Sequence, residues 1–175
     1  MSNHPLVITY TGNGKGKTTA ALGILFRSLG HHKRCAVLQF IKNGNLVTGE
    51  RKMAEQSDVL WESHGVGFTW EHDRESNTAA SVEGFRRFQQ LIDTGSYDLI
   101  ILDEFTYPVS LGFLDESEVM SYLKDVKKRR KRPHIVITGR DAPASLIEIS
   151  DLVSEIVEVK HPMKSNIGPQ MMIEY

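Results

Sequence analysis

The stretch YTGNGKGKTTAALG, from Tyr10 to Gly23, decides the fold, because it places a glycine-rich loop between an apolar run and a helical pattern. The loop closes as a phosphate-binding loop (P-loop) does, with Gly16-Lys17-Thr18. The usual P-loop has a glycine five residues before Gly16, where this chain has Thr11 and supplies its glycine one position later, at Gly12. The stretch therefore predicts a variant P-loop in the usual context of a strand followed by a helix.

The residue types of this loop suit an anionic ligand. Glycines let the backbone approach anionic oxygens with its N–H groups pointing inward, and a helix that begins near Lys17 adds its positive end. Lys17 supplies a mobile cation for the outer phosphates, and Thr18 supplies a hydroxyl for Mg²⁺. The residues predicted to bind the nucleotide are Gly12, Asn13, Gly14, Lys15, Gly16, Lys17, Thr18 and Thr19.

Two other interpretations of the glycines are weaker. A dinucleotide-binding fingerprint needs a third glycine where the chain has Lys17, and an acid at the end of the second strand, which runs out at Gln39-Phe40. An ordinary glycine-rich turn would not account for the buried strand before the loop and the helix after it. We therefore set both aside.

A second motif, DLIILDE (Asp98–Glu104), resembles the Walker B element, a buried strand that ends in acids. Its carboxylate can reach Mg²⁺ or a water bound to it. Together with the P-loop, it predicts a nucleoside triphosphate with Mg²⁺ as the ligand. We assign catalytic roles to Lys17, Thr18, Asp103 and Glu104, and ligation of Mg²⁺ to Thr18 and Asp103.

The choice of nucleotide and of chemistry is only partly fixed by these residues. A GTPase would need a guanine-reading motif such as NKxD, and the sequence has none, so ATP is favoured. On the residues alone, a kinase and an ATPase both remain possible.

Strand-like and helical runs alternate along the chain, which indicates an α/β fold. Near-continuous apolar runs are typical of strands buried on both faces, hence of a parallel sheet covered by helices. We predict a P-loop NTPase fold of the RecA-like type, with a mostly parallel central sheet and helices on both faces, in a single domain over residues 1–175. The predicted strands are Leu6–Tyr10, Cys35–Phe40, Asp98–Asp103, His134–Thr138 and Leu152–Val159, and the predicted helices are Lys17–Leu29, Thr78–Ile92, Glu116–Arg132 and Ala144–Ile149.

Two parts of this assignment carry further expectations. Ile41–Asn77 is the least regular segment, since its glycines and asparagines forbid one long element, and a compact domain usually keeps such a segment for function. The first helix is expected to present one apolar face, made of Ala21, Leu22, Leu25, Phe26 and Leu29.

Composition and charge limit the class of protein. The 175 residues are 40% hydrophobic with a net charge of -1, which indicates a globular protein and argues against nucleic acid or an anionic membrane as partner. A single cysteine, Cys35, excludes an internal disulfide and fits the reducing cytoplasm, and its apolar surroundings predict burial in a strand. We expect neither a signal peptide nor a membrane span, because no apolar run has the required length.

The basic run KKRRKR, Lys127–Arg132, is the sharpest local charge feature. A phosphate-rich partner would explain it, and so would the solvated carboxyl end of a helix before Pro133, where bases complement the helix dipole. We favour the second explanation, because the rest of the chain is not basic. The seven histidines show no paired spacing of the ligand type, so we expect no structural metal site.

Further strings occur in a fixed order along nearly the whole chain: YTGNGKGKTTAALG, QFIK, GFTW, YDLIILDEFTY, VITGRDAP, LIEISDLVSEI, VKHP and MMIEY. In these strings and their order the chain resembles the P-loop ATP:corrinoid adenosyltransferases, the cob(I)alamin adenosyltransferases that make adenosylcobalamin. The motifs outside the loop belong to no common kinase or helicase pattern, which makes the combination specific.

The resemblance implies an unusual reaction, in which the Co(I) nucleophile of cob(I)alamin attacks C5′ of the ATP ribose and inorganic triphosphate leaves. No residue has to act as a nucleophile, so the protein must orient C5′ and stabilise a highly charged leaving group. The resemblance further implies ATP and cob(I)alamin or a related corrinoid as substrates, Mg²⁺ as cofactor, a flavoprotein reductant as partner, and a homodimer.

Residues outside the loop also gain roles from the resemblance. Phe68 and Trp70 of GFTW would lie near the lower face of the corrin and displace its lower axial ligand, the alternative being a small core under the loop. Arg140 would contact phosphate, the alternative being a salt bridge to Asp141 or Glu148. Other residues in similar motifs are Gln39, Lys42, Thr106 and Glu148.

The chain also departs from the family pattern. It reaches its first strand by Leu6, where the family often has an N-terminal extension thought to help cover the corrinoid, so we expect this cover to be either missing or supplied otherwise. Asn43 stands where the family often has glycine, and the tail matches only partly, with Pro169 in its middle. Two alternatives stay open: a RecA-like ATPase or kinase acting on another substrate, and a nucleotide-dependent module that binds corrinoid without turnover.

Overall fold

The computed structural model describes residues 4–41, 48–67 and 73–173. They form one six-stranded sheet in the order β3-β2-β4-β5-β1-β6, and each described strand pair is parallel. The strands are β1 (Val7–Thr11), β2 (Cys35–Phe40), β3 (Leu60–His64), β4 (Leu99–Asp103), β5 (His134–Thr138) and β6 (Leu152–Glu155).

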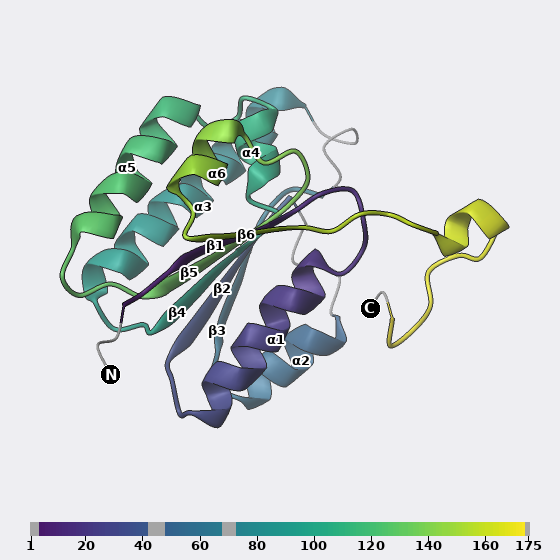
Figure 1. The fold of residues 1–175 in the computed structure, drawn as a ribbon, viewed down its shortest axis with the longest axis horizontal. Coiled ribbons are helices and arrows are strands. Elements are labelled where there is room, and N and C mark those ends of the chain that lie inside the picture. The colour runs from purple at the N-terminus through teal and green to yellow at the C-terminus, as the bar shows by residue number, and fades with distance from the viewer. Residues whose placement is uncertain (1–3, 42–47, 68–72, 174–175) are drawn as a thin grey trace.

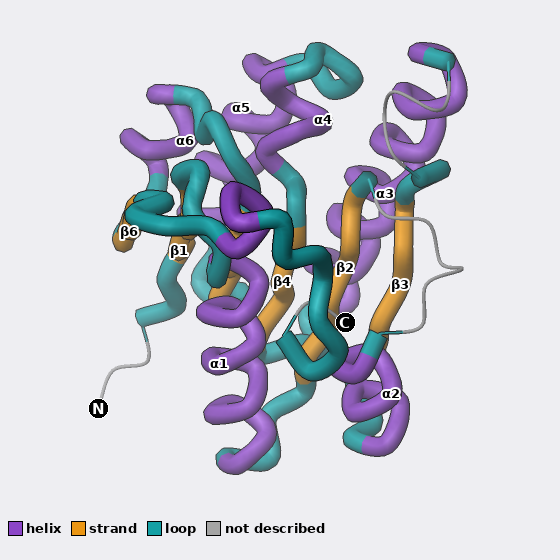
Figure 2. Tube along the Cα trace, turned by 90° about the vertical axis from the view of Figure 1, so that its right-hand side faces the viewer, coloured by secondary structure: helices purple, strands orange, loops and turns teal. Residues whose placement is uncertain are grey.

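Helices cover both faces of this sheet, as Figures 1 and 2 show. One face carries α1 (Lys17–Gly30) and α2 (Gly49–Gln56). The other carries α3 (Arg74–Thr94), α4 (Thr106–Ser110), α5 (Glu116–Lys128) and α6 (Ala144–Ile149). A short 3₁₀ helix, η1 (Pro162–Ser165), lies in the tail that leaves the sheet after β6. The predicted fold class, a parallel sheet between two helical layers, is confirmed.

The central strand β4 shows why the apolar runs are nearly continuous. Ile100 and Leu102 pack into the core beneath α3 and α5, while Leu99 and Ile101 pack into the core beneath α1. All four side chains are at most 2% exposed, because both faces of the sheet are covered. Cys35 of β2 lies in the same α1 core and is buried, as predicted.

Local signals set the ends of the long helices. The Asp73 carboxylate accepts a hydrogen bond from the Ser76 backbone N–H at 2.8 Å and begins α3, and Gly95 ends it with a φ of 59°. The helix α5 ends at Lys128 rather than at the predicted Arg132. Its cap Arg129 adopts an extended backbone, which lets the guanidinium pair with Asp93 of α3 at 2.7 Å.

The segment 41–77 and the face of α1 differ from expectation. The predicted irregular segment contains α2 and β3, two elements that the sequence analysis did not assign. Phe26 was expected on the buried face of α1, yet it is 81% exposed, because the face of that helix that packs on the sheet is centred on Ala21 and Leu25. Among the described helices, none is long and apolar enough to cross a membrane.

Candidate functional site

The loop between β1 and α1 has the geometry that its glycines predict. Gly12 and Gly16 have φ angles of 94° and 113°, a left-handed region that side chains disfavour, and Gly16 directly precedes the first turn of α1. The backbone N–H groups of that turn lack helical partners, so they face any anion held at the loop.

The chain after β6 packs directly against this loop, which the sequence did not reveal. The Ile156 N–H donates to Thr11 O at 2.8 Å, and the Gly14 N–H donates to Ile156 O at 2.7 Å. A Cβ atom on Gly14 would lie 2.8 Å from Ile156 O. The predicted strand therefore ends at Glu155 instead of Val159, because the following residues brace the P-loop.

Lys17 is held inside the loop rather than extended into solvent. Its Nζ donates to Gly12 O at 2.7 Å and to Gly14 O at 2.8 Å, and the residue is only 8% exposed. Burial lowers the pKa of Lys17 below its usual value, although the nearby carboxylate of Glu104 opposes the shift. The ammonium is thus preorganised beneath the surface that a phosphate would contact.

Asp103, at the carboxyl end of β4, gathers donors from three other elements. Its Oδ1 accepts from Thr18 Oγ1 at 2.8 Å and from Thr138 Oγ1 at 2.7 Å, and its Oδ2 accepts from Gln39 Nε2 at 3.1 Å. The residue is 1% exposed. This network joins the predicted Walker B acid to the P-loop threonine.

Thr138 is the member of this network that the sequence analysis missed. It ends β5, the strand next to β4, and its hydroxyl also accepts from the Glu104 N–H at 2.9 Å. That bond holds Glu104 at a φ of 58°. A threonine at the end of a buried strand that neighbours the Walker B strand is the signal that could have identified it.

Thr138→Val should lower the free energy of unfolding by about 1–3 kcal/mol, because the Glu104 N–H loses its acceptor and Asp103 loses a donor. Turnover should fall with it, since both acids then lose their positions, while Thr138→Ser should restore both quantities. Thermal unfolding and steady-state assays of the two variants measure this. A Thr138→Val protein with the melting temperature and turnover of the wild type would show that the hydroxyl positions nothing.

A cavity of about 690 Å³ opens above the P-loop. Glu104, Tyr107 and Arg140 also line it, and Met172 and Ile173 line it from the tail that follows β6. Burial raises the pKa of Tyr107, so the phenol stays a neutral donor at this wall. The loop residues that line the cavity are Gly14, Lys15, Gly16, Lys17, Thr18 and Thr19.

The remaining predicted residues fall into two groups, those that are exposed at the loop or cavity and those that lie outside the described residues. Asn13 is exposed at the tip of the loop, and Arg140 is exposed at the cavity wall. Among the described residues, neither Asp141 nor Glu148 forms a salt bridge with Arg140, so the alternative proposed for this arginine has no support here. Phe68, Trp70 and Lys42 lie outside the described residues.

Hard oxygen donors meet at the floor of this cavity. No group of three or more His, Cys, Asp or Glu side chains that could hold a metal occurs within 4–41, 48–67 and 73–173. Mg²⁺, however, is usually bound by one or two protein oxygens together with substrate phosphates, and dedicated protein cages are the exception. The Thr18 hydroxyl and the Asp103 carboxylate, 2.8 Å apart, have the chemistry for that mode.

Comparison with known proteins covers the chain almost from end to end. A family model described as ATP:corrinoid adenosyltransferase BtuR/CobO/CobP matches residues 3–175. The corrinoid adenosyltransferase of Escherichia coli (strain K12) is 40% identical over 174 residues, covering 97% of this chain and 85% of that protein. The corrinoid adenosyltransferase CobA of Salmonella typhimurium (strain LT2) is 39% identical over 171 residues, with the same coverage of 97% and 85%.

Solved structures support the fold. The crystal structure of the RadB recombinase matches with a TM-score of 0.53 at 12% identity, covering 90% of this chain and 77% of that one. At this identity the likeness concerns the fold alone, and it confirms the predicted RecA-like P-loop class.

Proposed function

The chain belongs to the family of ATP:corrinoid adenosyltransferases, and from this premise we propose that it transfers the 5′-deoxyadenosyl group of ATP to the Co(I) centre of cob(I)alamin or a related corrinoid. In this reaction a bond forms between cobalt and C5′, and the bond from C5′ to the triphosphate oxygen breaks. The electron pair of the broken bond leaves with inorganic triphosphate, and Co(I) becomes Co(III).

One observation carries the proposal: the whole-length family match coincides with a P-loop whose lysine is held on the loop carbonyls and whose threonine is hydrogen-bonded to the Walker B acid. The leaving group is a triphosphate that departs whole, so the site must stabilise the negative charge that the triphosphate gains at its α-phosphate oxygen as the C5′–O bond breaks. Lys17 and the first turn of α1 supply fixed positive charge there. Arg140, an exposed residue that also lines the cavity, adds another cation.

Mg²⁺ fits the same site, with Thr18 and Asp103 as the residues that would hold it. When bound, the ion would neutralise part of the charge on the triphosphate. Gln39 and Thr138 keep the Asp103 carboxylate oriented toward Thr18. Glu104 contributes a second carboxylate at the cavity wall.

The corrinoid side of the site rests on the resemblance. We propose that Phe68 and Trp70 present an apolar surface to the lower face of the corrin, where it takes the place of the lower ligand and of water. Cobalt without an axial donor is easier to reduce from cob(II) to Co(I). We further propose that the protein is a homodimer, that a flavoprotein supplies the electron, and that the protein acts in the cytoplasm. The single free thiol of Cys35 is compatible with that reducing compartment.

Phe68→Ala and Trp70→Ala should slow adenosylation about tenfold or more when cob(II)alamin must be reduced on the enzyme. ATP affinity should stay near normal, because neither residue belongs to the P-loop, and the defect should shrink when cob(I)alamin is supplied. The cobalamin spectrum with Mg–ATP, read together with the melting temperature, measures this. If stable variants still form four-coordinate cob(II)alamin, the two aromatic residues do not have this role.

The reaction itself is tested by its products. An anaerobic assay with chemically reduced cobalamin and Mg–ATP should yield adenosylcobalamin and inorganic triphosphate in equal amounts. ADP and orthophosphate would instead identify the alternative, a RecA-like ATPase or kinase. Corrinoid binding without turnover would identify a binding module.

A further inference from the structure

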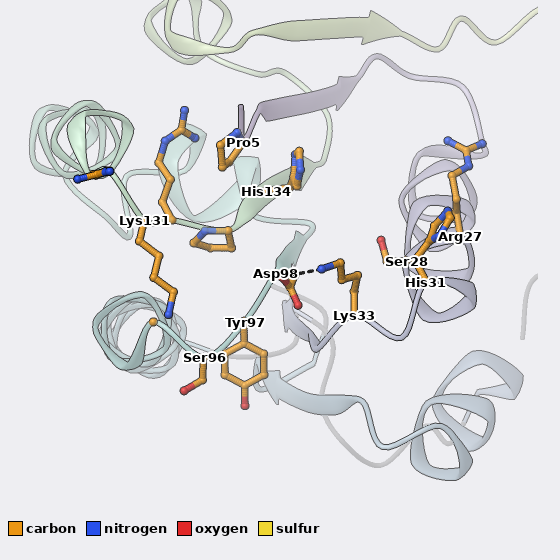
Figure 3. Close-up of a pocket in the computed structure, with 14 residues that line it drawn as sticks. Pro5, Arg27, Ser28, His31, Lys33, Ser96, Tyr97, Asp98, Lys131 and His134 are labelled. Carbon is orange, nitrogen blue, oxygen red and sulfur yellow. Dashed lines mark hydrogen bonds and ion pairs between the residues drawn. The ribbon is translucent and has the colours of Figure 1, made fainter. Parts of the chain in front are cut away.

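A second cavity, of about 540 Å³, lies at the edge of the sheet opposite the P-loop. Pro5, Asp98 and His134 line it from the amino ends of β1, β4 and β5, so we call it the basal cavity. Figure 3 looks onto it, with Arg27 of α1 on one side, Lys131 on the other, and the Lys33–Asp98 pair between them. Nothing in the proposed reaction uses this region.

Positive charge is concentrated in the basal cavity. Five cationic side chains line it against one carboxylate, that of Asp98, although the whole chain has a net charge of -1. The carboxyl ends of α1, α3 and α5 also meet there, and each contributes about half a negative charge. Neutralising the three helix ends therefore requires only about one and a half positive charges, which leaves most of the excess positive charge in the cavity uncompensated. The five cations are Arg27, Lys33, Arg130, Lys131 and Arg132.

Within the part of the chain that the structure describes, most of these cations have no carboxylate partner, in contrast to their neighbours on α5. Lys127, Lys128 and Arg129 form salt bridges of 2.7–2.8 Å with Asp151, Asp125 and Asp93. Among the described residues, Lys33 alone of the five forms one, at 3.5 Å to Asp98. The basic run thus divides at Arg129: its first half is neutralised on the helix, and its second half faces the cavity.

An unpaired nitrogen of Arg132 is an independent observation that favours an anion in the basal cavity. Its Nη1 is buried and has no hydrogen-bond partner within the described part of the chain. A guanidinium nitrogen shielded from water and left without an acceptor is costly, and an anion that draws the guanidinium toward the cavity would remove that cost. His134 lies two residues on, and its Nδ1 accepts from the Leu6 N–H at 3.1 Å, so the neutral ring carries its proton on Nε2.

We propose that the basal cavity binds a small oligophosphate, an anion with two or more linked phosphate groups, at a site separate from the P-loop. An anion with linked phosphates can contact cations on both sides of the cavity at once, which matches the way the positive charge is distributed there. Arg132 matches the bidentate geometry of a phosphate oxygen pair, and the lysines act as point charges. The two sites lie at opposite ends of five-residue strands, roughly 17 Å apart, so both can be filled together.

Equilibrium dialysis with radiolabelled inorganic pyrophosphate, without Mg²⁺ and at moderate ionic strength, tests the proposal on the full chain. The wild type should bind about two equivalents, one at each site. Lys17→Ala should retain the basal equivalent. Lys131→Gln/Arg132→Gln should retain the P-loop equivalent and weaken the basal one about tenfold or more.

Lys124→Gln/Lys128→Gln is the matched control, because it removes the same charge from α5 residues that do not line the cavity. It should bind two equivalents like the wild type. An equal loss in the control would show that the effect comes from the overall charge and not from the cavity, which would overturn the proposal. Loss of all pyrophosphate binding in folded Lys17→Ala would overturn it as well. If Arg132→Gln impairs folding, Arg130→Gln/Lys131→Gln changes two exposed residues instead, and unweakened binding by that folded variant would equally overturn it.

Discussion

Lys17→Ala is expected to reduce adenosylation by roughly a hundredfold to a thousandfold while the protein stays folded. The lysine supplies a fixed cation at the position where the triphosphate gains charge, and one such preorganised contact typically contributes about 3–4 kcal/mol to the transition state. Its present partners are the carbonyl oxygens of Gly12 and Gly14, so the alanine variant loses two hydrogen bonds within the loop and none in the core.

Lys15→Ala is the matched comparison, because it removes the same charge from an exposed residue of the same loop. Its loss should be several-fold at most, since an exposed ammonium is screened by water. Rates with saturating Mg–ATP and cob(I)alamin, together with circular dichroism, make the comparison. Near-normal activity in a folded Lys17→Ala protein would refute the assignment of the P-loop.

The buried position of Lys17 also gives the reaction a pH dependence. Burial lowers the pKa of this lysine, so the free protein loses the ammonium at a lower pH than an exposed lysine would. ATP affinity should therefore weaken as the pH rises into the alkaline range, and it should be stable below that range, where the lysine is protonated. Lys17→Ala should lack this dependence, which titration of ATP binding against pH can show.

The sequence was sufficient to predict the parts of the fold that are buried on both faces. The strands β1, β2, β4 and β5 were predicted to within a residue at each end, because apolar side chains must point both ways in a covered parallel sheet. The glycine pattern of Gly12–Gly16 similarly predicts the loop, since the backbone there needs positive φ angles.

Elements at the edges carry weaker signals. The edge strand β3, LWESH, is half-buried throughout and mixes polar with apolar residues, and the helix α2, GERKMAEQ, buries only Ala54. Neither has the apolar periodicity on which a prediction depends. The helix α4 was missed for a different reason, because Pro108 falls inside its five residues and suggests a break.

The site was predictable residue by residue but not as a network. The motifs indicated Lys17, Thr18 and Asp103, yet the bonds that join Asp103 to Gln39 and Thr138 depend on which strands become neighbours. No single motif indicates the order of the strands in the sheet. The packing of Ile156 against Gly14 is likewise a contact between residues far apart in the chain.

Asp103→Asn should abolish most of the response of turnover to Mg²⁺ while changing ATP affinity much less, because a Walker B carboxylate acts through the metal. The network around Asp103 adds a second effect that the motif alone does not predict. An amide has one acceptor oxygen, so its NH₂ group must face either the Gln39 amide or the two threonine hydroxyls. Stability should fall by about 1–3 kcal/mol as a result.

A compensating change separates these two effects. Asp103→Asn/Gln39→Glu exchanges the amide and the carboxylate across a 3.1 Å hydrogen bond between paired residues of β2 and β4, which restores complementary donors and acceptors. The double variant should recover most of the lost melting temperature, yet its turnover should remain insensitive to Mg²⁺, because the carboxylate no longer faces Thr18. Titrating Mg²⁺ at fixed ATP in all three proteins measures this. If Asp103→Asn keeps the wild-type Mg²⁺ response, Asp103 is purely structural, and Glu104, whose side chain lines the cavity, becomes the residue to substitute next.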